Sequence, residues 1–246
     1  MNQPPLIDDK AADKPSWPEL VIEEGVRFDA LLELKSRDRS LGKRERTRFL
    51  VVSRLARQLL DEPAKRPLIE VILDETGLSR GTFYNYFTDI DEAVEALLGA
   101  FFKALWSRRS MRTAKDRTRP GFDPVYETNL WYCRAYETNA GLFAAFSQVA
   151  TYTPSLLRMR EAMNADWVER VLTAASRKRA RPFETAERQA FQGAVRLLIA
   201  MSIEALRERY VHRDALLLKS FPDAETLAQG LTAIWRRTIE DHVGKS

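Results

Sequence analysis

The 246-residue sequence predicts an all-α protein, and three features of the sequence lead to this fold class. Apolar residues recur at spacings of three and four through most of the chain, which is the period of an amphipathic helix. Helix-start signals precede several of these stretches, whereas the chain has no Asn-Gly or Asp-Gly hairpin turn. One cysteine, ten glycines and 30% charged residues are typical of a globular protein and exclude a disulfide scaffold.

The first part of the chain holds an extension followed by several short helices. Residues 1–18 contain four prolines and several acids and are expected to be disordered. Gly77 is expected to close one helix, and the spacing of Asp89 and Glu92 is that of a capping box at the start of another. The helices expected in this part cover residues 26–36, 44–60, 68–75 and 91–109.

Four longer helices are expected in the rest of the chain, and each begins at a recognisable start signal. Asp123-Pro124 and Thr153-Pro154 each place a capping residue before a proline at the first helical position. Thr185 and Pro222-Asp223 mark the starts of the last two helices. The four helices are expected over residues 124–136, 154–178, 186–210 and 223–242.

Charge is distributed unevenly along the chain. The net charge is +4, which alone is a weak sign of an anionic partner. Residues 1–34 carry eight acids and three bases, whereas residues 35–57 carry nine bases and two acids. This change from net negative to net positive charge marks a boundary in the chain between residues 34 and 35. A second basic run over residues 108–119 is expected to be a solvated helix end that leads into a loop.

Residues 68–87, with the sequence LIEVILDETGLSRGTFYNYF, form the most specific segment. A helix-turn-helix needs a support helix, a turn residue that accepts a left-handed conformation, and a second helix with one polar face. Gly77 suits the turn, Ser79 suits the cap of the second helix, and Phe83 and Phe87 are spaced to face the core. The residues left facing outward suit phosphates and base edges, and they are Arg80, Thr82, Tyr84, Asn85 and Tyr86. Gly81 would let the helix backbone approach the DNA closely.

The stretch from Thr76 to Phe87, TGLSRGTFYNYF, resembles the DNA-binding signature of the TetR family of bacterial transcriptional regulators. The resemblance covers residues 43–106. It implies a three-helix helix-turn-helix DNA-binding domain over residues 43–90, with residues 80–86 as the recognition helix. Residues 1–42 are an extension that departs from the family pattern, in which the chain commonly begins a few residues before the first helix. The resemblance further implies a larger helical ligand-binding and dimerisation domain over residues 91–246, whose first helix, 91–109, links the two domains.

DNA contacts are expected from the second helix of the motif and from the start of the basic helix before it. The expected contact residues are Lys43, Arg44, Arg46, Arg48, Ser79, Arg80, Gly81, Thr82, Tyr84, Asn85 and Tyr86. Two positions depart from the family pattern, because Leu73 stands where a small residue is usual and Ile90 where lysine is common. The missing lysine removes one expected phosphate contact. Residues 35–48 are either a basic arm for the DNA minor groove or part of a flexible, solvated tail.

Aromatic and methionine side chains gather between residues 125 and 172. Such side chains line cavities for apolar ligands, and they also fill cores, so both interpretations stay open here. The resemblance implies a small-molecule effector, apolar or aromatic, in this domain. The candidate ligand-binding residues are Trp131, Tyr132, Tyr136, Phe143, Phe146, Met159, Met163 and Trp167.

The last two expected helices each have an apolar face wider than one partner helix would cover. Two helices from each of two subunits would form a four-helix interface, and the alternative is that both faces pack within one subunit. The candidate residues of a dimer interface are Phe191, Val195, Leu198, Ser202, Leu227, Leu231, Ile234 and Trp235.

The sequence thus predicts a repressor that binds a palindromic DNA operator as a homodimer and is released by a small-molecule effector. The alternative is a helical ligand-binding or protein-interaction module without DNA-binding activity. An enzyme, a metal site or another cofactor is not expected, because Cys133, His212 and His242 are too sparse. No apolar run reaches bilayer length and no signal peptide begins the chain, so a cytoplasmic protein without a membrane partner is expected.

Overall fold

The computed structural model describes residues 20–22, 24–63, 65–110 and 121–243. Within these residues every regular element is a helix, as the sequence predicts. The elements are α1 (Phe28–Ser36), α2 (Lys43–Asp61), α3 (Ile69–Thr76), α4 (Arg80–Tyr84), α5 (Ile90–Ser110), α7 (Pro124–Val149), α8 (Pro154–Ser176), α9 (Thr185–Arg207), the π-helical turn η1 (Glu208–His212), α10 (Ala215–Ser220) and α11 (Ala224–Val243). The predicted disordered segment 1–18 and the side chains of the basic run 108–119 lie outside the described residues.

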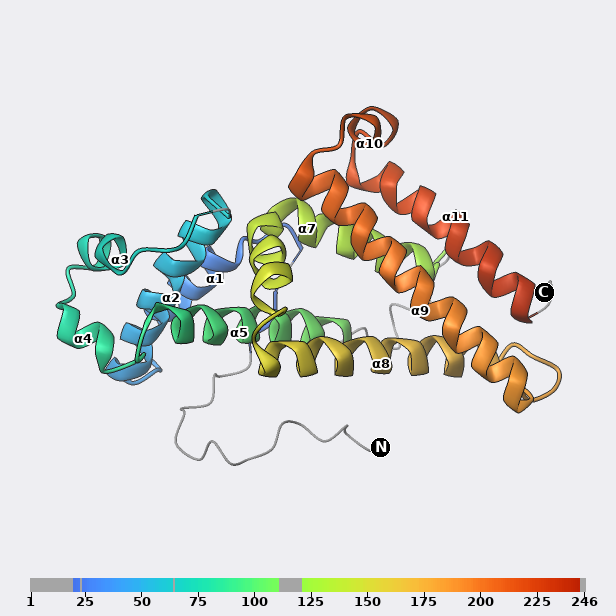
Figure 1. Ribbon diagram of the computed structural model, residues 1–246, viewed down its shortest axis with the longest axis horizontal. Coiled ribbons are helices and arrows are strands. Elements are labelled where there is room, and N and C mark those ends of the chain that lie inside the picture. The colour runs from blue at the N-terminus through green and yellow to red at the C-terminus, as the bar shows by residue number, and fades with distance from the viewer. Residues whose placement is uncertain (1–19, 23, 64, 111–120, 244–246) are drawn as a thin grey trace.

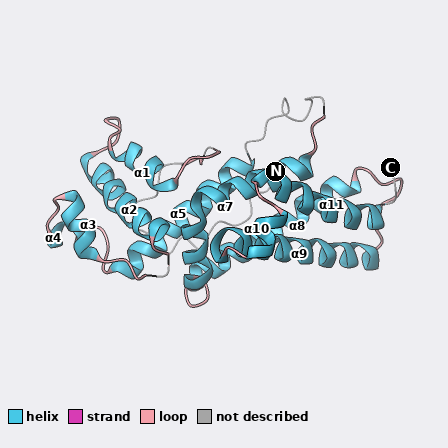
Figure 2. Ribbon diagram, turned by 90° about the horizontal axis from the view of Figure 1, so that it is seen from above, coloured by secondary structure: helices cyan, strands magenta, loops and turns pink. Residues whose placement is uncertain are grey.

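The molecule is elongated, with α1 to α4 gathered at one end and α8, α9 and α11 extending to the other (Figure 1). Helix α5 runs from the first end along one edge and packs against α7 and α8. Helix α7 lies in the middle, where it packs against α2 on one side and α11 on the other. Figure 2 shows α9 and α11 running side by side at the far end.

Two hydrophobic cores hold the helices together. The larger one joins side chains of α1, α2, α5, α7 and α11, including Phe28, Phe101 and Phe143. The smaller one lies between α8, α9 and α11 and is built around Trp167, Phe191 and Trp235. Because the larger core continues from α2 through α5 to α7, the end formed by α1 to α4 is packed directly against the middle of the molecule.

Most of the predicted helix starts are confirmed, and side chains explain them. Asp123 accepts a hydrogen bond from the Val125 N–H at 3.0 Å, and Asp223 accepts one from the Thr226 N–H at 2.8 Å. The expected cap by the Thr153 hydroxyl is wrong, because that side chain makes no capping hydrogen bond. Pro154 alone marks the start of α8, since its ring fixes the backbone angle that the first helical residue needs.

The end predicted for α7 is wrong, because the helix continues from Tyr136 to Val149 across a kink at Asn139. Asn139 has the non-helical angles φ −128° and ψ 30°. Residues 141–146 are all buried, so this part of α7 has no polar face and no helical period in its sequence. The short helix α10 was not expected, and Asp214 caps it by accepting from the Leu217 N–H at 2.8 Å.

The extension before α2 is folded from residue 20 onward, except for residue 23, which is not described. The predicted helix over residues 26–36 is confirmed as α1, which packs along α2. Leu20, Ile22, Phe28 and Leu32 are buried in the larger core. Residues 35–48 belong to the end of α1, the turn that follows and the start of α2, so over these residues the structure shows neither a free arm nor a free tail.

Candidate nucleic-acid interface

The turn between α3 and α4 is built by Gly77 and Ser79, as the sequence predicts. Gly77 ends α3 in the left-handed conformation, with φ 67° and ψ 16°, and its N–H donates to the Leu73 carbonyl at 2.8 Å. The Ser79 hydroxyl then accepts from the Thr82 N–H at 3.1 Å and so begins α4. Helix α4 ends at Tyr84, which makes it shorter than the expected range of 80–86.

Two phenylalanine rings anchor the inner side of this segment. Phe83 and Phe87 are buried in the larger core, with their ring centres 5.8 Å apart. With that side fixed, Arg80, Tyr84 and Asn85 are exposed on the other, and Tyr84 keeps 46% of its surface accessible. Gly81 is exposed as well, whereas Thr82 and Tyr86 are half-buried. The Thr82 hydroxyl lies within hydrogen-bond distance of the Ser79 hydroxyl, at 2.9 Å.

Arg80 is paired with an acid that the sequence pattern did not bring to attention. Its guanidinium forms an ion pair with the Glu70 carboxylate at the start of α3, and both side chains are more than half exposed. Hydrogen bonds from its own backbone N–H and from Arg80 lower the pKa of Glu70. An anion that binds Arg80 must therefore compete with the Glu70 carboxylate.

The basic residues at the start of α2 lie beside the end of this segment. Lys43 and Arg44 are exposed in the first turn of α2. The Arg48 guanidinium lies over the Phe87 ring, 5.7 Å from its centre, which brings α2 next to the residues that follow α4. Arg46 is half-buried and donates to the Leu41 carbonyl at 3.1 Å, so it supports the turn between α1 and α2.

The arginines in the second half of the basic stretch are paired with acids of the protein. Arg54 and Arg57 donate to the Glu33 carboxylate of α1 at 2.8 Å and 2.9 Å. The hydrogen bond from Arg54 is the main reason why the pKa of Glu33 is lowered. These two arginines thus neutralise acids of α1, and the exposed positive charge lies nearer the start of α2.

The structure accounts for Ile90, the residue that stands where the family pattern has lysine. Ile90 begins α5 and is 7% exposed in the larger core, so a lysine there would bury its charge. Leu73 is half-buried against the same core. Both departures from the pattern therefore fill core positions.

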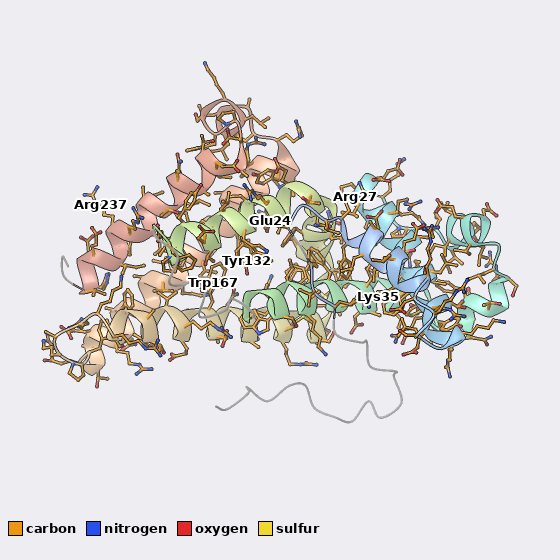
Figure 3. The ribbon with its side chains drawn as sticks, turned by 180° about the vertical axis from the view of Figure 1, so that it is seen from behind. Glu24, Arg27, Lys35, Tyr132, Trp167 and Arg237 are labelled. Atoms are coloured by element: carbon orange, nitrogen blue, oxygen red, sulfur yellow. The ribbon has the colours of Figure 1, made fainter. Side chains whose placement is uncertain are left out.

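The predicted ligand-binding residues fall into two packed groups. In one, Tyr132 stacks on Trp167 with ring centres 5.0 Å apart, and Figure 3 shows the two side chains side by side. In the other, Tyr136 stacks on Phe143 at 3.7 Å. The remaining members are the buried Trp131 and Phe146 and the half-buried Met159 and Met163.

Sequence reasoning missed Tyr210, which lies in the π-helical turn η1 with its ring centre 6.5 Å from that of Tyr136. Its hydroxyl is buried and has no hydrogen-bond partner among the described residues. Nearby, burial raises the pKa of the Cys133 thiol to about 12, so this thiol is protonated at neutral pH.

Most of the predicted dimer-interface residues are buried inside the single chain, which corrects the choice of helix face. The buried ones are Phe191, Val195, Leu198, Ser202, Leu227, Leu231 and Trp235, and of the eight only Ile234 is exposed, at 47%. Trp235 donates from its indole N–H to the Ser202 hydroxyl at 2.9 Å, which fixes this internal packing. Leu197 on α9, which is 73% exposed, was not expected. Each helix has apolar residues on two faces, and the sequence did not distinguish the inward face from the outward one.

Comparison of the chain with protein-family models, with curated proteins and with solved structures finds no match. None of the described helices combines the length and the apolar character that crossing a membrane requires. Across the described ranges, histidine, cysteine, aspartate and glutamate side chains form no group of three that could hold a metal ion.

Proposed function

We propose that the protein is a ligand-responsive transcriptional repressor of the TetR type, which binds a palindromic operator on double-stranded DNA as a homodimer. The observation that carries this proposal is the geometry of residues 77–87, where Phe83 and Phe87 anchor one side and Arg80, Tyr84 and Asn85 face solvent on the other. The resemblance of Thr76 to Phe87 to the TetR signature supports the same assignment.

In this proposal α4 enters the DNA major groove, and α3 is the helix that supports it. Tyr84 and Asn85 meet base edges together with Thr82, since a ring, an amide and a hydroxyl recognise bases by hydrogen bonds and by contact with thymine methyl groups. Lys43, Arg44 and Arg80 bind phosphates and hold the protein in register. Residues 43–90 then form the DNA-binding domain.

The proposed dimer uses the outward faces of α9 and α11. Leu197 and Ile234 are exposed apolar side chains on these faces. The same two helices also carry small exposed residues that allow close approach of helices, namely Ala190, Gly193, Ala200 and Ala233. Joining these faces from two subunits gives a four-helix interface, which places two copies of α4 to meet successive major grooves about 34 Å apart.

The proposed effector binds in the helical domain beyond α5. Tyr210 and Tyr136 support this part of the proposal, since one offers a buried hydroxyl without a partner and both adjoin the packed aromatic side chains of α7. An apolar or aromatic molecule with one polar group would satisfy that hydroxyl. The effector favours a conformation in which the two copies of α4 no longer match the operator spacing.

A module without DNA-binding activity is the second candidate, and two observations favour it. The Glu70 carboxylate occupies the Arg80 guanidinium, and Ile90 provides no charge where the family pattern has lysine. Such a module would bind a ligand or a protein partner through the helical part. It would show no salt-dependent affinity for any duplex DNA.

The two candidates are separated by fluorescence anisotropy with the full chain and a duplex enriched from a random pool. The double variant Thr82→Ala, Tyr84→Ala is expected to lower affinity for that duplex at least tenfold, because each lost base contact costs about 1 to 3 kcal/mol. Tyr152→Ala is the matched control, since Tyr152 is 73% exposed but lies in the turn after α7. Unchanged affinity of the double variant would exclude α4 as the reader.

A further inference from the structure

The kink of α7 is joined to the segment before α1 by a single buried side chain. Asn139 accepts a hydrogen bond from the Phe28 N–H at 2.8 Å and donates one to the Val26 carbonyl at 3.3 Å. Asn139 is 1% exposed and has non-helical backbone angles. Its amide therefore satisfies two backbone groups of residues more than one hundred positions earlier in the chain.

Just after this kink, α7 touches the backbone of α2. A Cβ atom added at Gly141 would lie 2.2 Å from the Leu59 carbonyl oxygen and 2.7 Å from the Leu60 Cα. Only glycine permits this approach, because any side chain would push the two helices apart. A shift of this part of α7 is consequently transmitted to the last turn of α2 without passing through α5.

The segment from residue 24 to residue 33 is fastened to the helices on both sides of that contact. Towards α2, Arg27 pairs with Asp61 at 2.9 Å, and Glu33 accepts from Arg54 and Arg57. Figure 3 shows Glu24 and Arg27 at the middle of the molecule, between its two ends.

On the other side, the segment is tied to α7 and α5. Glu24 pairs with Arg134 of α7 at 2.6 Å, and Arg134 also pairs with Glu225 of α11. The Phe28 ring packs edge-on against Phe101 of α5, with ring centres 5.2 Å apart. The segment thus contacts each of α2, α5 and α7, the helices that connect the two ends.

We infer that residues 24–33 form a strap that fixes the angle between α2 and α7, and that Asn139 is the positioning residue that locks it. A rotation of the α2–α4 end relative to α7 must either break the two Asn139 hydrogen bonds or break the ion pairs that hold Arg27 and Glu33 to α2. In this inference the arrangement seen here is the locked one, and breaking the Asn139 hydrogen bonds gives a released one. A bound ligand can bias such an element by favouring one of the two. The effect of the strap on DNA binding rests on the proposed function, whereas the strap itself does not.

The strap is tested by measuring the distance between the two ends in the full chain. Spin labels at Asp74→Cys on α3 and Thr173→Cys on α8 report this distance, because both positions are exposed and the native Cys133 is buried. We expect Asn139→Ala to shift or broaden the distance distribution while helical content by circular dichroism stays unchanged. Amide hydrogen exchange at Phe28 is expected to speed up at least tenfold. Asn164→Ala on α8 is the matched control, and it should change neither the distance distribution nor the exchange rate at Phe28.

An unchanged distance distribution together with unchanged exchange at Phe28 would overturn the strap. If Asn139→Ala does not fold, the distance distribution and the exchange at Phe28 are measured in Asn139→Ser instead. The serine side chain is too short to reach both Val26 and Phe28. DNA affinity is measured in parallel and is expected to fall about tenfold in the same variant. Absence of DNA binding by the native chain would refute the proposed function but would leave the distance measurement as a valid test of the strap.

Discussion

Arg80 and Glu70 show how one pair of residues can set the strength of the proposed DNA contact. The Glu70 carboxylate offsets the charge of Arg80 and occupies one of its guanidinium nitrogens, so it weakens the attraction of Arg80 for a phosphate. Glu70→Gln is therefore expected to raise affinity for duplex DNA about three- to tenfold. It should also make the dependence of log affinity on log salt steeper by about one, as for one added phosphate contact.

The measurement is anisotropy of a labelled duplex over a series of salt concentrations. Glu62→Gln serves as the control, because it also removes an exposed carboxylate and breaks an ion pair, in this case with Lys65. An equal gain in DNA affinity in both variants would mean that the gain comes from the change in overall charge and not from Arg80. No gain in Glu70→Gln would show that Arg80 does not meet DNA.

Glu33 gives a prediction about stability and pH. Arg54 holds the pKa of the Glu33 carboxylate below its ordinary value in the folded protein. A lowered pKa contributes stability that is present above the ordinary glutamate pKa and is lost as the pH falls through the lowered value. Glu33→Gln is thus expected to lower the free energy of unfolding at pH 7 by about 1 to 3 kcal/mol, as charged hydrogen bonds do when broken.

Urea unfolding of both proteins between pH 7 and pH 3 tests this prediction. The difference in free energy of unfolding between the two proteins should shrink as the pH falls towards 3. The Glu33 carboxylate of the native protein then becomes protonated and loses its charged interaction with Arg54, which the variant lacks at every pH. A difference that stays constant over this range would show that the carboxylate charge is not what stabilises the contact between α1 and α2.

Residues whose roles depend on near neighbours in the sequence are the ones that the sequence predicted well. Gly77, Ser79, Phe83 and Phe87 lie within one short segment, and each is found in its expected conformation or burial. The pair of Arg80 with Glu70 was missed because ten positions separate them, and the pair of Phe28 with Asn139 because 111 positions do. Such distant pairs follow from how helices pack, which local patterns do not determine.

At the scale of helices, the faces of α9 and α11 limit what sequence periodicity can predict. Both helices were expected, but the face assigned to dimerisation is packed inside the chain, as Phe191, Val195 and Trp235 show. A helix of an interface has two apolar faces, so periodicity marks the helix without telling which face meets a second subunit.

The same limit applies to α7, where buried residues surround the helix after Asn139 and leave no polar face to reveal the period. Start signals, by contrast, are local. Asp123 and Asp223 cap their helices with side-chain hydrogen bonds two or three residues ahead, and both starts were predicted from the sequence. Helix beginnings were therefore more predictable than helix ends.

The outward face of α9 carries the prediction about the dimer. Leu197→Glu is expected to shift the protein from dimer to monomer, because symmetry places the new charge twice in an apolar interface. Leu216→Glu on α10 is the matched control, since Leu216 is 70% exposed and Leu197 is 73% exposed. Sedimentation velocity of the two variants gives the result, with circular dichroism to confirm folding. A Leu197→Glu variant that remains dimeric would exclude the outward face of α9 as the dimer interface.

For the whole molecule, the shared core is what links the proposed reader to the rest of the protein. Helices α1, α2, α5 and α7 contribute to one hydrophobic interior, so α2 to α4 do not hang from a flexible linker. A ligand that moves α7 therefore has two routes to the reader, through α5 and through the contact of Gly141 with α2. The proposed DNA-binding segment is thus packed directly onto the helices that lead to the rest of the molecule.

The central claim is that α4 reads DNA sequence, and selection from a random duplex library with the full-length protein tests it most directly. The account predicts that the recovered duplexes share a palindrome whose half-sites lie about one helical turn, or a multiple of it, apart. The same duplexes should not be enriched by the Thr82→Ala, Tyr84→Ala variant. Recovery of no common sequence by the native protein, or recovery of the same sequence by the variant, would contradict the account.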